Sequence, residues 1–321
     1  MTRGLVIGKF LPIHNGHIAL IQYAATACDE LIVSMSYTNQ DAIDPLLRLS
    51  WIKEIFKNNP NIKPLMILDD FDEESLPLLE RTKIWADVIK KTYASINVLF
   101  SSEGYGEPFA KHLNAVHKIF DLDRKQVPVS STLIRNQPFA YWDFIPEIVR
   151  PYFVKIVCFY GPESTGKSVM AKYMSEKYKT EFVPEVAREI VTSNDFTLDD
   201  IVKVGYAQHE RIQKKLKTAN KILFCDTDAI TTQIYSKYYL NSVPEVLYEL
   251  EEKTNYLQYF LFDVDVPWIA DDLRDLGEKR TEMYTLFKQA LEERKINYIP
   301  VKGTYQEREI FITAIIEKLL Q

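Results

Sequence analysis

The chain alternates short apolar runs with segments in which apolar residues recur every three or four positions. Short apolar runs between turn residues are typical of buried strands, and the second spacing is typical of amphipathic helices. We expect strands at 5–7, 30–36, 64–68, 96–100, 127–130, 154–159, 181–185, 221–226, 256–265 and 296–301. We expect helices at 18–28, 45–56, 78–93, 169–178 and 198–217, and one from Gly303 to the end. Strands that alternate with helices predict parallel, doubly wound α/β sheets, whose ligands bind at the carboxyl ends of the strands.

The alternation is interrupted once, near the middle of the chain, where Pro138, Pro146 and Pro151 cluster. Proline ends helices and marks connecting segments. We interpret 141–152 as a closing helix and a linker, after which a new alternation begins. The sequence therefore predicts two doubly wound domains, residues 1–150 and residues 151–321, each of ordinary domain size.

A loop of the second domain fits the phosphate-loop pattern G-x-x-x-x-G-K-[ST] in full, in Gly161-Pro162-Glu163-Ser164-Thr165-Gly166-Lys167-Ser168. The two glycines allow the backbone to wrap around phosphates. Lys167 can reach the β- and γ-phosphates of ATP, and the Ser168 hydroxyl can hold Mg²⁺. The alternative is an ordinary glycine turn before a helix. The apolar strand before the loop and the amphipathic helix after it favour the phosphate site.

The first domain has a loop in the same setting, Gly8-Lys9-Phe10-Leu11-Pro12-Ile13-His14-Asn15-Gly16-His17, which ends in H-x-G-H. Backbone N–H groups and the positive end of the helix dipole converge where such a loop enters a helix, which favours phosphate binding. His14 and His17 are three residues apart and share one face of the first turn. The alternative is a structural pair whose rings bond to neighbouring carbonyl groups.

The segment Ser130-Ser131-Thr132-Leu133-Ile134-Arg135 is a further phosphate-site candidate in the first domain. Serine or threonine caps a helix start and leaves free N–H groups there, and Arg135 lies one turn further on. A plain helix cap with a solvated arginine is the alternative for this segment taken by itself.

The second domain also has carboxylates at predicted strand ends. Asp226 ends the apolar strand 221–226 and Asp228 follows it, where a Mg²⁺-facing carboxylate is expected. Glu185, with Arg188 one turn on, is the first choice for the base that takes the proton of an attacking hydroxyl, and Asp226 and Asp228 are the other candidates. The alternatives are that Glu185 pairs with Arg188 and that Asp228 caps the next helix.

Composition narrows the class of ligand. The 321 residues carry a net charge of −6 and no Lys/Arg cluster, so nucleotides are expected in preference to nucleic acids. Cys28, Cys158 and Cys225 lie in or beside apolar runs and predict thiols in a reducing compartment. No apolar run approaches membrane-spanning length, and the first strand begins too early for a signal peptide, so we expect a cytoplasmic protein without membrane contact.

Together these motifs resemble a known family, the bifunctional nicotinamide-nucleotide adenylyltransferase/ribosylnicotinamide kinases. In the first half, the similarity rests on Gly8, Phe10, Pro12, His14, Gly16 and His17 with Ser131, Thr132 and Arg135. In the second half, it rests on the phosphate loop, Pro184-Glu185 with Arg188, Asp226-Thr227-Asp228, and a lid-like stretch with Trp268, Arg274 and Arg280. The resemblance implies an HxGH nucleotidyltransferase Rossmann-like domain followed by a P-loop kinase domain. Some members add an N-terminal helix-turn-helix domain, which we do not expect here because the first strand begins almost at once.

The resemblance also implies a reaction sequence and roles. The second domain would phosphorylate nicotinamide riboside with ATP and Mg²⁺, and the first would join the resulting mononucleotide (NMN) to ATP to give NAD and pyrophosphate. His14 and His17 would face the ATP phosphates, Arg135 would hold the β- and γ-phosphates, and Lys9 would lie near the reacting phosphate. Trp85 would stack on nicotinamide, although a helical Trp is also a common core residue.

Two other functions stay open on the sequence. One is phosphopantetheine adenylyltransferase fused to dephospho-coenzyme-A kinase, which has the same order of sites. The other is a nucleotide-sensing regulator without turnover, against which the intact lysine, histidines and carboxylates argue. The preference between nicotinamide and nicotinic acid, and the oligomeric state, including a homo-oligomer, also stay open.

Overall fold

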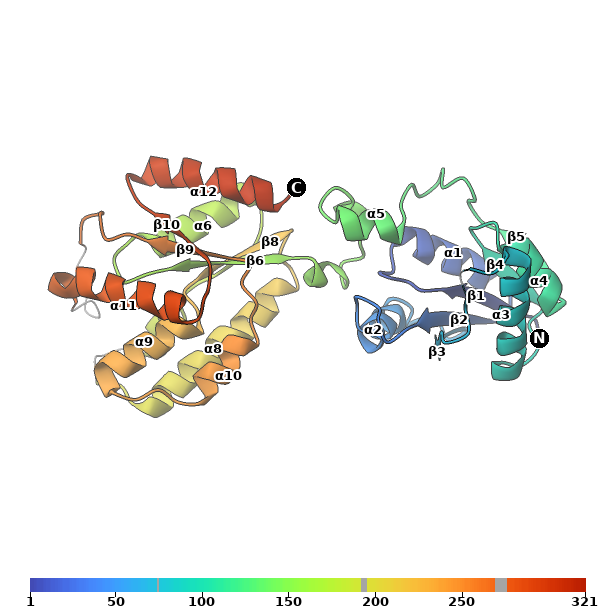
Figure 1. The fold of residues 1–321 in the computed structure, drawn as a ribbon, viewed down its shortest axis with the longest axis horizontal. Helices are drawn as coiled ribbons and strands as arrows, with labels where there is room; N and C mark the ends of the chain where they lie inside the picture. Colours follow the sequence, from blue (N-terminus) through green and yellow to red (C-terminus); the bar gives the residue numbers. More distant parts are fainter. Residues whose placement is uncertain (74, 192–194, 269–275) are drawn as a thin grey trace. The chain divides into compact units, whose positions relative to one another are not determined.

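The computed structural model describes residues 1–73, 75–191, 195–268 and 276–321. The chain divides into two compact units, Met1–Arg150 and Pro151–Gln321 (Figure 1). Each unit is built on its own five-stranded sheet, and every recorded strand pair is parallel. The fold class inferred from the alternating pattern, two doubly wound parallel-sheet domains, is therefore confirmed.

The sheet of the first unit has the strand order β3-β2-β1-β4-β5. Its strands are β1 (Arg3–Gly8), β2 (Glu30–Tyr37), β3 (Ile62–Leu68), β4 (Val98–Ser101) and β5 (Val116–Ile119). Its helices are α1 (Asn15–Thr26), α2 (Pro45–Ile55), α3 (Leu78–Thr92), α4 (Gly106–Leu113) and α5 (Ser131–Asn136), followed by the short 3-10 helices η1 (Trp142–Phe144) and η2 (Arg150–Tyr152). The chain reverses its direction across the sheet between β1 and β4, which is where such folds bind ligands.

Helices α3 and α4 cover one face of this sheet. Ile89 of α3 and Phe109 of α4 pack in one buried cluster with Leu5 of β1 and Leu99 of β4. Because β1 is the central strand, this burial holds its carboxyl end rigidly in place. The loop that leaves β1 therefore starts from a fixed position.

The sheet of the second unit has the order β10-β9-β6-β8-β7. Its strands are β6 (Lys155–Tyr160), β7 (Phe182–Val183), β8 (Ile222–Asp226), β9 (Gln258–Phe262) and β10 (Tyr298–Val301). Its helices are α6 (Lys167–Tyr178), α7 (Ala187–Ile190), α8 (Leu198–Leu216), α9 (Ala229–Leu240), α10 (Val246–Glu252), α11 (Arg280–Glu293) and α12 (Tyr305–Leu319), with a 3-10 turn η3 (Gly277–Lys279) before α11.

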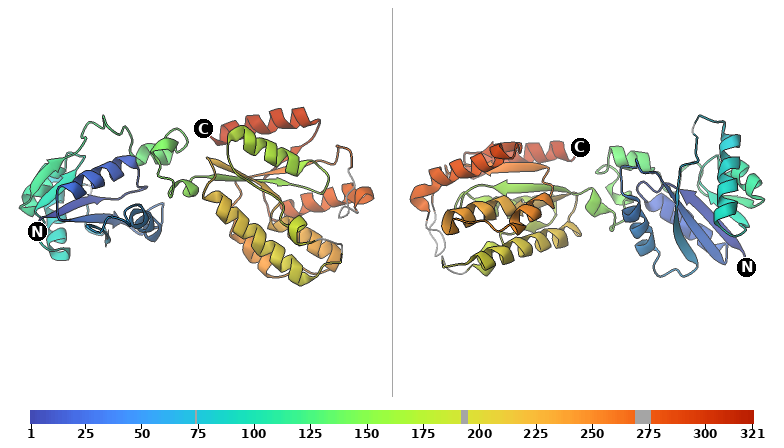
Figure 2. Two further views of the ribbon diagram at one scale, coloured as in Figure 1. Left: turned by 180° about the vertical axis from the view of Figure 1, so that it is seen from behind. Right: turned by 60° about the horizontal axis from the view of Figure 1, so that its bottom comes forward.

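Residues of the central strand β6 alternate between the two faces of this sheet. Phe159 packs with α6 and α12 on one face, and its neighbour Tyr160 packs with α9 and α11 on the other. The two layers of helices are visible on either side of the sheet in Figure 1 and, from behind, in Figure 2. Because both faces are covered, the strand is apolar from Ile156 to Tyr160.

Two local predictions are wrong, several helices and one strand were not predicted, and one prediction falls partly outside the described residues. Residues 127–130, all of them described, are not a strand, because Asp121 holds the loop before them in a turn by accepting the backbone N–H groups of Lys125, Gln126 and Val127. The predicted closing helix at 141–152 is instead the two 3-10 helices η1 and η2, since its prolines remove the hydrogen bonds that a longer helix needs. Helix α4 and strand β5 were not predicted because neither has a long apolar pattern. The predicted lid falls partly on 269–275, outside the described residues.

In the part of the chain that the structure describes, none of the helices has the length and apolar character needed to cross a membrane.

Candidate active sites

The H-x-G-H motif forms the entry to α1. His14 caps this helix, because its Nδ1 accepts the backbone N–H groups of Gly16 at 3.1 Å and of His17 at 3.4 Å. The two imidazole rings stack with centroids 3.7 Å apart. Since Nδ1 of His14 accepts hydrogen bonds, its proton lies on Nε2. The motif is thus both a helix cap and a stacked pair of rings.

Both rings are neutral at physiological pH. Burial, with Arg124 nearby, lowers the pKa of His14 to about 3. Burial, then His14 and Arg124, hold the pKa of His17 well below its ordinary value. Neutral imidazoles can donate a hydrogen bond to a developing negative charge without the cost of burying a cation.

The segment 130–135 lies against the β1–α1 loop. Ser131 Oγ donates to the carbonyl oxygen of Pro12 at 3.0 Å, and Arg135 donates to the carbonyl oxygen of Leu11. Ser130 caps α5 by accepting the N–H of Leu133 at 3.2 Å. The two phosphate-site candidates of the first domain, more than one hundred residues apart in the chain, therefore form one site.

Arg124 was not predicted, and it lines the same cavity. It has a positive φ of 52° in the loop that Asp121 holds, and its guanidinium donates to Glu103 at 3.3 Å. It is the cation that acts on both histidines. No local motif surrounds it, so only the folded loop could place it here.

Trp85 is half-buried and lines this cavity. Its Nε1 donates to Asp72 at 3.0 Å, and Arg81 pairs with the same carboxylate at 2.6 Å while its guanidinium lies 5.3 Å from the centre of the indole ring. Hydrogen bonds from Arg81, then Trp85, lower the pKa of Asp72 despite its partial burial. Asp72 and Arg81, both missed by the motif analysis, thus fix the orientation of the indole.

The cavity enclosed by these segments has a volume of about 530 Å³. It is lined by every residue proposed from the sequence for the first site: Gly8, Lys9, Phe10, His14, His17, Trp85, Ser130, Ser131, Thr132 and Arg135. Such a volume is in the range of small-ligand sites.

The phosphate loop of the second unit runs from β6 to α6. Gly161 has φ 134° and Gly166 has φ 84°, values that side chains rarely allow, and a Cβ at Gly161 would meet the carbonyl oxygen of Phe262 at 2.9 Å. Lys167 Nζ donates to the carbonyl oxygen of Pro162 at 2.7 Å, inside the loop. Burial lowers the pKa of Lys167, and the nearby Asp226 and Glu185 act in the opposite direction.

Asp226 ends β8 beside this loop. It is buried, and burial raises the pKa of its carboxyl to about 6 although Lys167 favours the charged form. Its carboxylate bonds to the Ser168 hydroxyl, while its Oδ1 has no hydrogen-bond partner among the described residues. A buried carboxylate oxygen without a partner next to a hydroxyl is a donor set that fits Mg²⁺.

Glu185 follows β7 and lines the cavity with Arg188, which donates to it at 3.2 Å. Gln208 of α8, not predicted, lines the same cavity and accepts the N–H of Val186 at 2.9 Å. The carboxylate of Glu185 therefore faces the cavity and is also paired, so both sequence interpretations of this residue describe part of its setting.

Asp228 is the N-cap of α9. Its Oδ1 accepts from the N–H and the hydroxyl of Thr231, both at 2.9 Å, and its Oδ2 accepts from Tyr259 at 3.0 Å. Burial raises its pKa to about 6. These contacts are those of the helix cap that was the alternative for this residue.

Of the lid residues, Arg274 lies outside the described residues. Arg280 donates to the carbonyl oxygens of Val266 at 2.9 Å and Ser164 at 3.2 Å, and Trp268 lies under its guanidinium at 5.7 Å. Glu163 of the phosphate loop accepts the N–H of Leu276 at 3.1 Å. Leu276 and Arg280 are thus bonded to the phosphate loop.

The second cavity has a volume of about 460 Å³. Its lining includes the phosphate-loop residues Gly161, Glu163, Ser164, Thr165, Gly166, Lys167 and Ser168 together with Glu185 and Arg188. A wall that the motifs did not indicate completes it: Val191, Phe196, Ile201, Val204, Tyr235 and Tyr239. A phosphate-binding end and an aromatic end within one cavity fit a nucleotide donor and a flat acceptor.

The chain is similar in sequence and in structure to known proteins. A family model described as an AAA domain matches residues 156–308. The trifunctional NAD biosynthesis/regulator protein NadR of Escherichia coli (strain K12) is 31% identical over 99% of this chain and 83% of its own. The crystal structures of a NadR protein in complex with NR, and in complex with NAD and AMP-PNP, share the fold. Each has a TM-score of 0.81 at 22% identity, over 98% of this chain and 95% of the other. By its sequence, this chain belongs to the NadR family of NAD biosynthesis/regulator proteins.

Proposed function

We propose that the chain is a bifunctional enzyme of NAD biosynthesis. Its second unit phosphorylates nicotinamide riboside with ATP to give NMN, and its first unit transfers the adenylyl group of ATP to NMN to give NAD and pyrophosphate. The observation that carries the proposal is that motif residues converge on a cavity in each unit: H-x-G-H with 130–135 in the first, and the phosphate loop with Glu185 and Arg188 in the second. Membership of the NadR family supports both activities, and a solved NadR protein holds NR in one structure and NAD with AMP-PNP in another.

In the kinase cavity, Lys167 and the N–H groups of the phosphate loop bind the β- and γ-phosphates. Ser168 and Asp226 hold Mg²⁺, which would neutralise charge on the phosphate oxygens. Glu185 accepts the proton of the riboside 5′-hydroxyl as that oxygen bonds to the γ-phosphorus and ADP leaves. Arg188 keeps this carboxylate oriented toward the cavity.

In the adenylyltransferase cavity, a phosphate oxygen of NMN attacks the α-phosphorus of ATP and pyrophosphate leaves. The neutral His14 and His17 stabilise the charge that develops on the phosphoryl oxygens, and Arg124 and Arg135 supply positive charge to the departing pyrophosphate. Lys9 is exposed at the cavity edge, within reach of the reacting phosphate. The sequence offers no evident serine or cysteine paired with a base, so direct displacement is the mechanism we propose.

An indole held by Asp72 and Arg81 is a flat apolar surface with a fixed orientation, and we assign Trp85 to the nicotinamide ring of NMN. In the other cavity, the aromatic wall of Phe196, Tyr235 and Tyr239 provides the corresponding surface for nicotinamide riboside.

Substrate assays of the purified chain test the proposal. With MgATP we expect phosphorylation of nicotinamide riboside and adenylylation of NMN. Phosphopantetheine and dephospho-coenzyme A serve as competing substrates, because they are the acceptors of the rival fusion enzyme. Turnover of those two but not of the nicotinamide compounds would overturn the assignment, and ATP binding without any turnover would favour a nucleotide sensor.

A further inference from the structure

A buried arginine of the last helix lines the kinase cavity and bonds to the phosphate loop. Arg308 lies in the first turn of α12 with 2% of its surface exposed, and its Nη1 donates to the carbonyl oxygen of Thr165 at 2.6 Å. Its other amino group, Nη2, donates to the carbonyl oxygen of Asp263 at 3.3 Å and to the carboxylate of Asp265. One guanidinium therefore joins α12, the end of β9 and the phosphate loop, although Arg308 and Thr165 are 143 residues apart in the chain.

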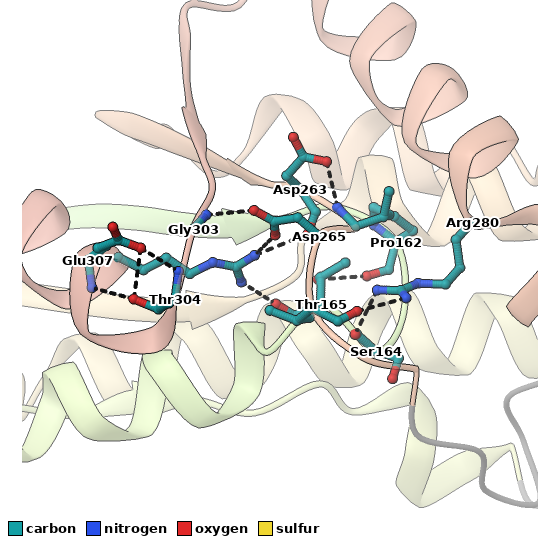
Figure 3. Close-up of polar contacts among 12 residues, drawn as sticks. Pro162, Ser164, Thr165, Asp263, Asp265, Arg280, Gly303, Thr304 and Glu307 are labelled. Carbon is teal, nitrogen blue, oxygen red and sulfur yellow. Dashed lines mark hydrogen bonds and ion pairs between the residues drawn. The ribbon is translucent and has the colours of Figure 1, made fainter.

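The support behind Arg308 is itself fixed. Asp265 also accepts the N–H of Gly303 at 2.6 Å, and Thr304 forms a capping box with Glu307 at the start of α12. These residues lie together near Thr165 (Figure 3). The position of the guanidinium is thus set by backbone groups and not by a single flexible partner.

The bond to Thr165 determines where the next N–H group points. The peptide unit is planar and trans, so its C=O and its N–H point in opposite directions. The carbonyl of Thr165 and the N–H of Gly166 belong to one such unit, and Gly166 lines the kinase cavity. Fixing the direction of the Thr165 carbonyl therefore also fixes the direction of the Gly166 N–H, a donor that a phosphate oxygen would accept in our proposal. Arg280 acts in the same way on the preceding unit through the carbonyl of Ser164.

We propose that Arg308 is a positioning residue of the kinase reaction, which pre-orients the phosphate loop for MgATP by holding the carbonyl oxygen of Thr165. The proposal rests on the proposed kinase activity of the second unit. It assigns a catalytic consequence to the C-terminal helix, which carries none of the sequence motifs. Without this bond the Gly166 N–H loses its fixed direction. Part of the free energy of MgATP binding would then be used to order the phosphate loop.

The test compares Arg308→Met, Arg308→Lys and a matched control, Arg294→Met, in the full chain. Arg294 is a partly buried arginine of the second unit, and it pairs with Glu251 at 2.7 Å and bonds to Gln233 at 2.7 Å, away from the phosphate loop. Adenylyl transfer by the first unit measures the amount of active protein in each sample. The readouts are MgADP affinity by calorimetry and kcat and KM for ATP and for nicotinamide riboside.

We expect Arg308→Met to weaken MgADP binding and to lower kcat/KM for ATP, each by about tenfold or more, because a charged hydrogen bond to a buried carbonyl is lost. The KM for nicotinamide riboside should change less than twofold. Arg308→Lys, which can reach only part of the three acceptors of the guanidinium, should give intermediate values. Arg294→Met should lower the thermal midpoint but leave the KM for ATP within about twofold of wild type.

The proposal would be overturned if Arg308→Met and Arg294→Met lowered the thermal midpoint equally while MgADP affinity and kcat/KM for ATP stayed unchanged in both. Arg308 would then be a merely structural residue. If Arg308→Met does not fold, Arg308→Lys decides, and a KM for ATP equal to that of wild type overturns it. A wild-type chain that binds MgADP but does not phosphorylate the riboside would refute the proposed kinase reaction. The effect of Arg308 on MgADP affinity would still decide its role in the loop.

Discussion

Lys167 Nζ lies 2.7 Å from the carbonyl oxygen of Pro162, so the lysine that should bind the ATP phosphates is bonded within its own loop. The amino group is buried, and Asp226 and Glu185 are the nearby groups that favour its charged form. A phosphate oxygen is a stronger acceptor for a cation than a neutral carbonyl. The lysine can therefore exchange its partner when ATP binds, without moving to another part of the cavity.

Lys167→Ala should abolish riboside phosphorylation, lowering kcat by at least about a hundredfold, since the cation at the β- and γ-phosphates is lost. Adenylyl transfer should continue at the wild-type rate, because the first unit has its own cavity. Separate assays with nicotinamide riboside and with NMN measure the two activities. Loss of both together would argue against independent sites.

His17→Ala should have the opposite pattern. We expect kcat for adenylyl transfer to fall by about a hundredfold while the kinase is unaffected, so that NMN accumulates from nicotinamide riboside. ATP binding to the first unit should persist, because the other cavity groups remain. Unchanged adenylyl transfer in this variant would remove His17 from the proposed mechanism.

Asp226→Asn should stabilise the second unit at high pH while abolishing kinase activity. The folded pKa of about 6 is raised by burial above the value of about 3.9 for an exposed aspartate. Such a group stabilises the fold fully below pH 4, and this contribution is lost as the pH rises through about 6. Without Mg²⁺ at pH 8, the variant should melt a few degrees higher than wild type, and the gain should vanish near pH 4. A lower melting temperature at pH 8 would show that the charged carboxylate stabilises the fold.

Trp85→Ala should raise the KM for NMN by about tenfold with a smaller effect on the KM for ATP, because the indole faces the nicotinamide end in our assignment. Trp85→Phe keeps an aromatic face but loses the bond to Asp72, so it should be milder. Steady-state kinetics with each substrate varied in turn separates the two effects. Equal changes in both constants would place the indole in the core of the unit.

The sequence could predict those parts of the two sites whose residues are contiguous in the chain. The phosphate loop and H-x-G-H are contiguous, and their strand–loop–helix setting is written in neighbouring residues, so their place in the fold followed directly. Arg124 could not be found in this way, because it reaches the histidines only through a loop that Asp121 holds. The aromatic wall of the kinase cavity, including Phe196 and Tyr239, comes from separate elements and carries no motif.

Asp228 shows a different limit. Its spacing from Asp226 gave it the same candidate role, yet the two carboxylates have different settings: Asp226 bonds to Ser168 beside the phosphate loop, and Asp228 caps α9. Successive residues after a strand leave it in different directions, and the turn geometry that separates them is a tertiary property. Thr227, between the two, has a positive φ of 70°.

The most direct test of the account is the product balance of the full chain with MgATP and nicotinamide riboside, followed in time by mass spectrometry. Two different cleavages of ATP in one polypeptide predict that NMN and ADP appear first, and that NAD and pyrophosphate follow in equal amounts. At completion, each NAD should correspond to one ADP and one pyrophosphate. Formation of NMN without NAD, or of neither product while both cavities bind ATP, would contradict the claim that this chain uses ATP once as a phosphoryl donor and once as an adenylyl donor.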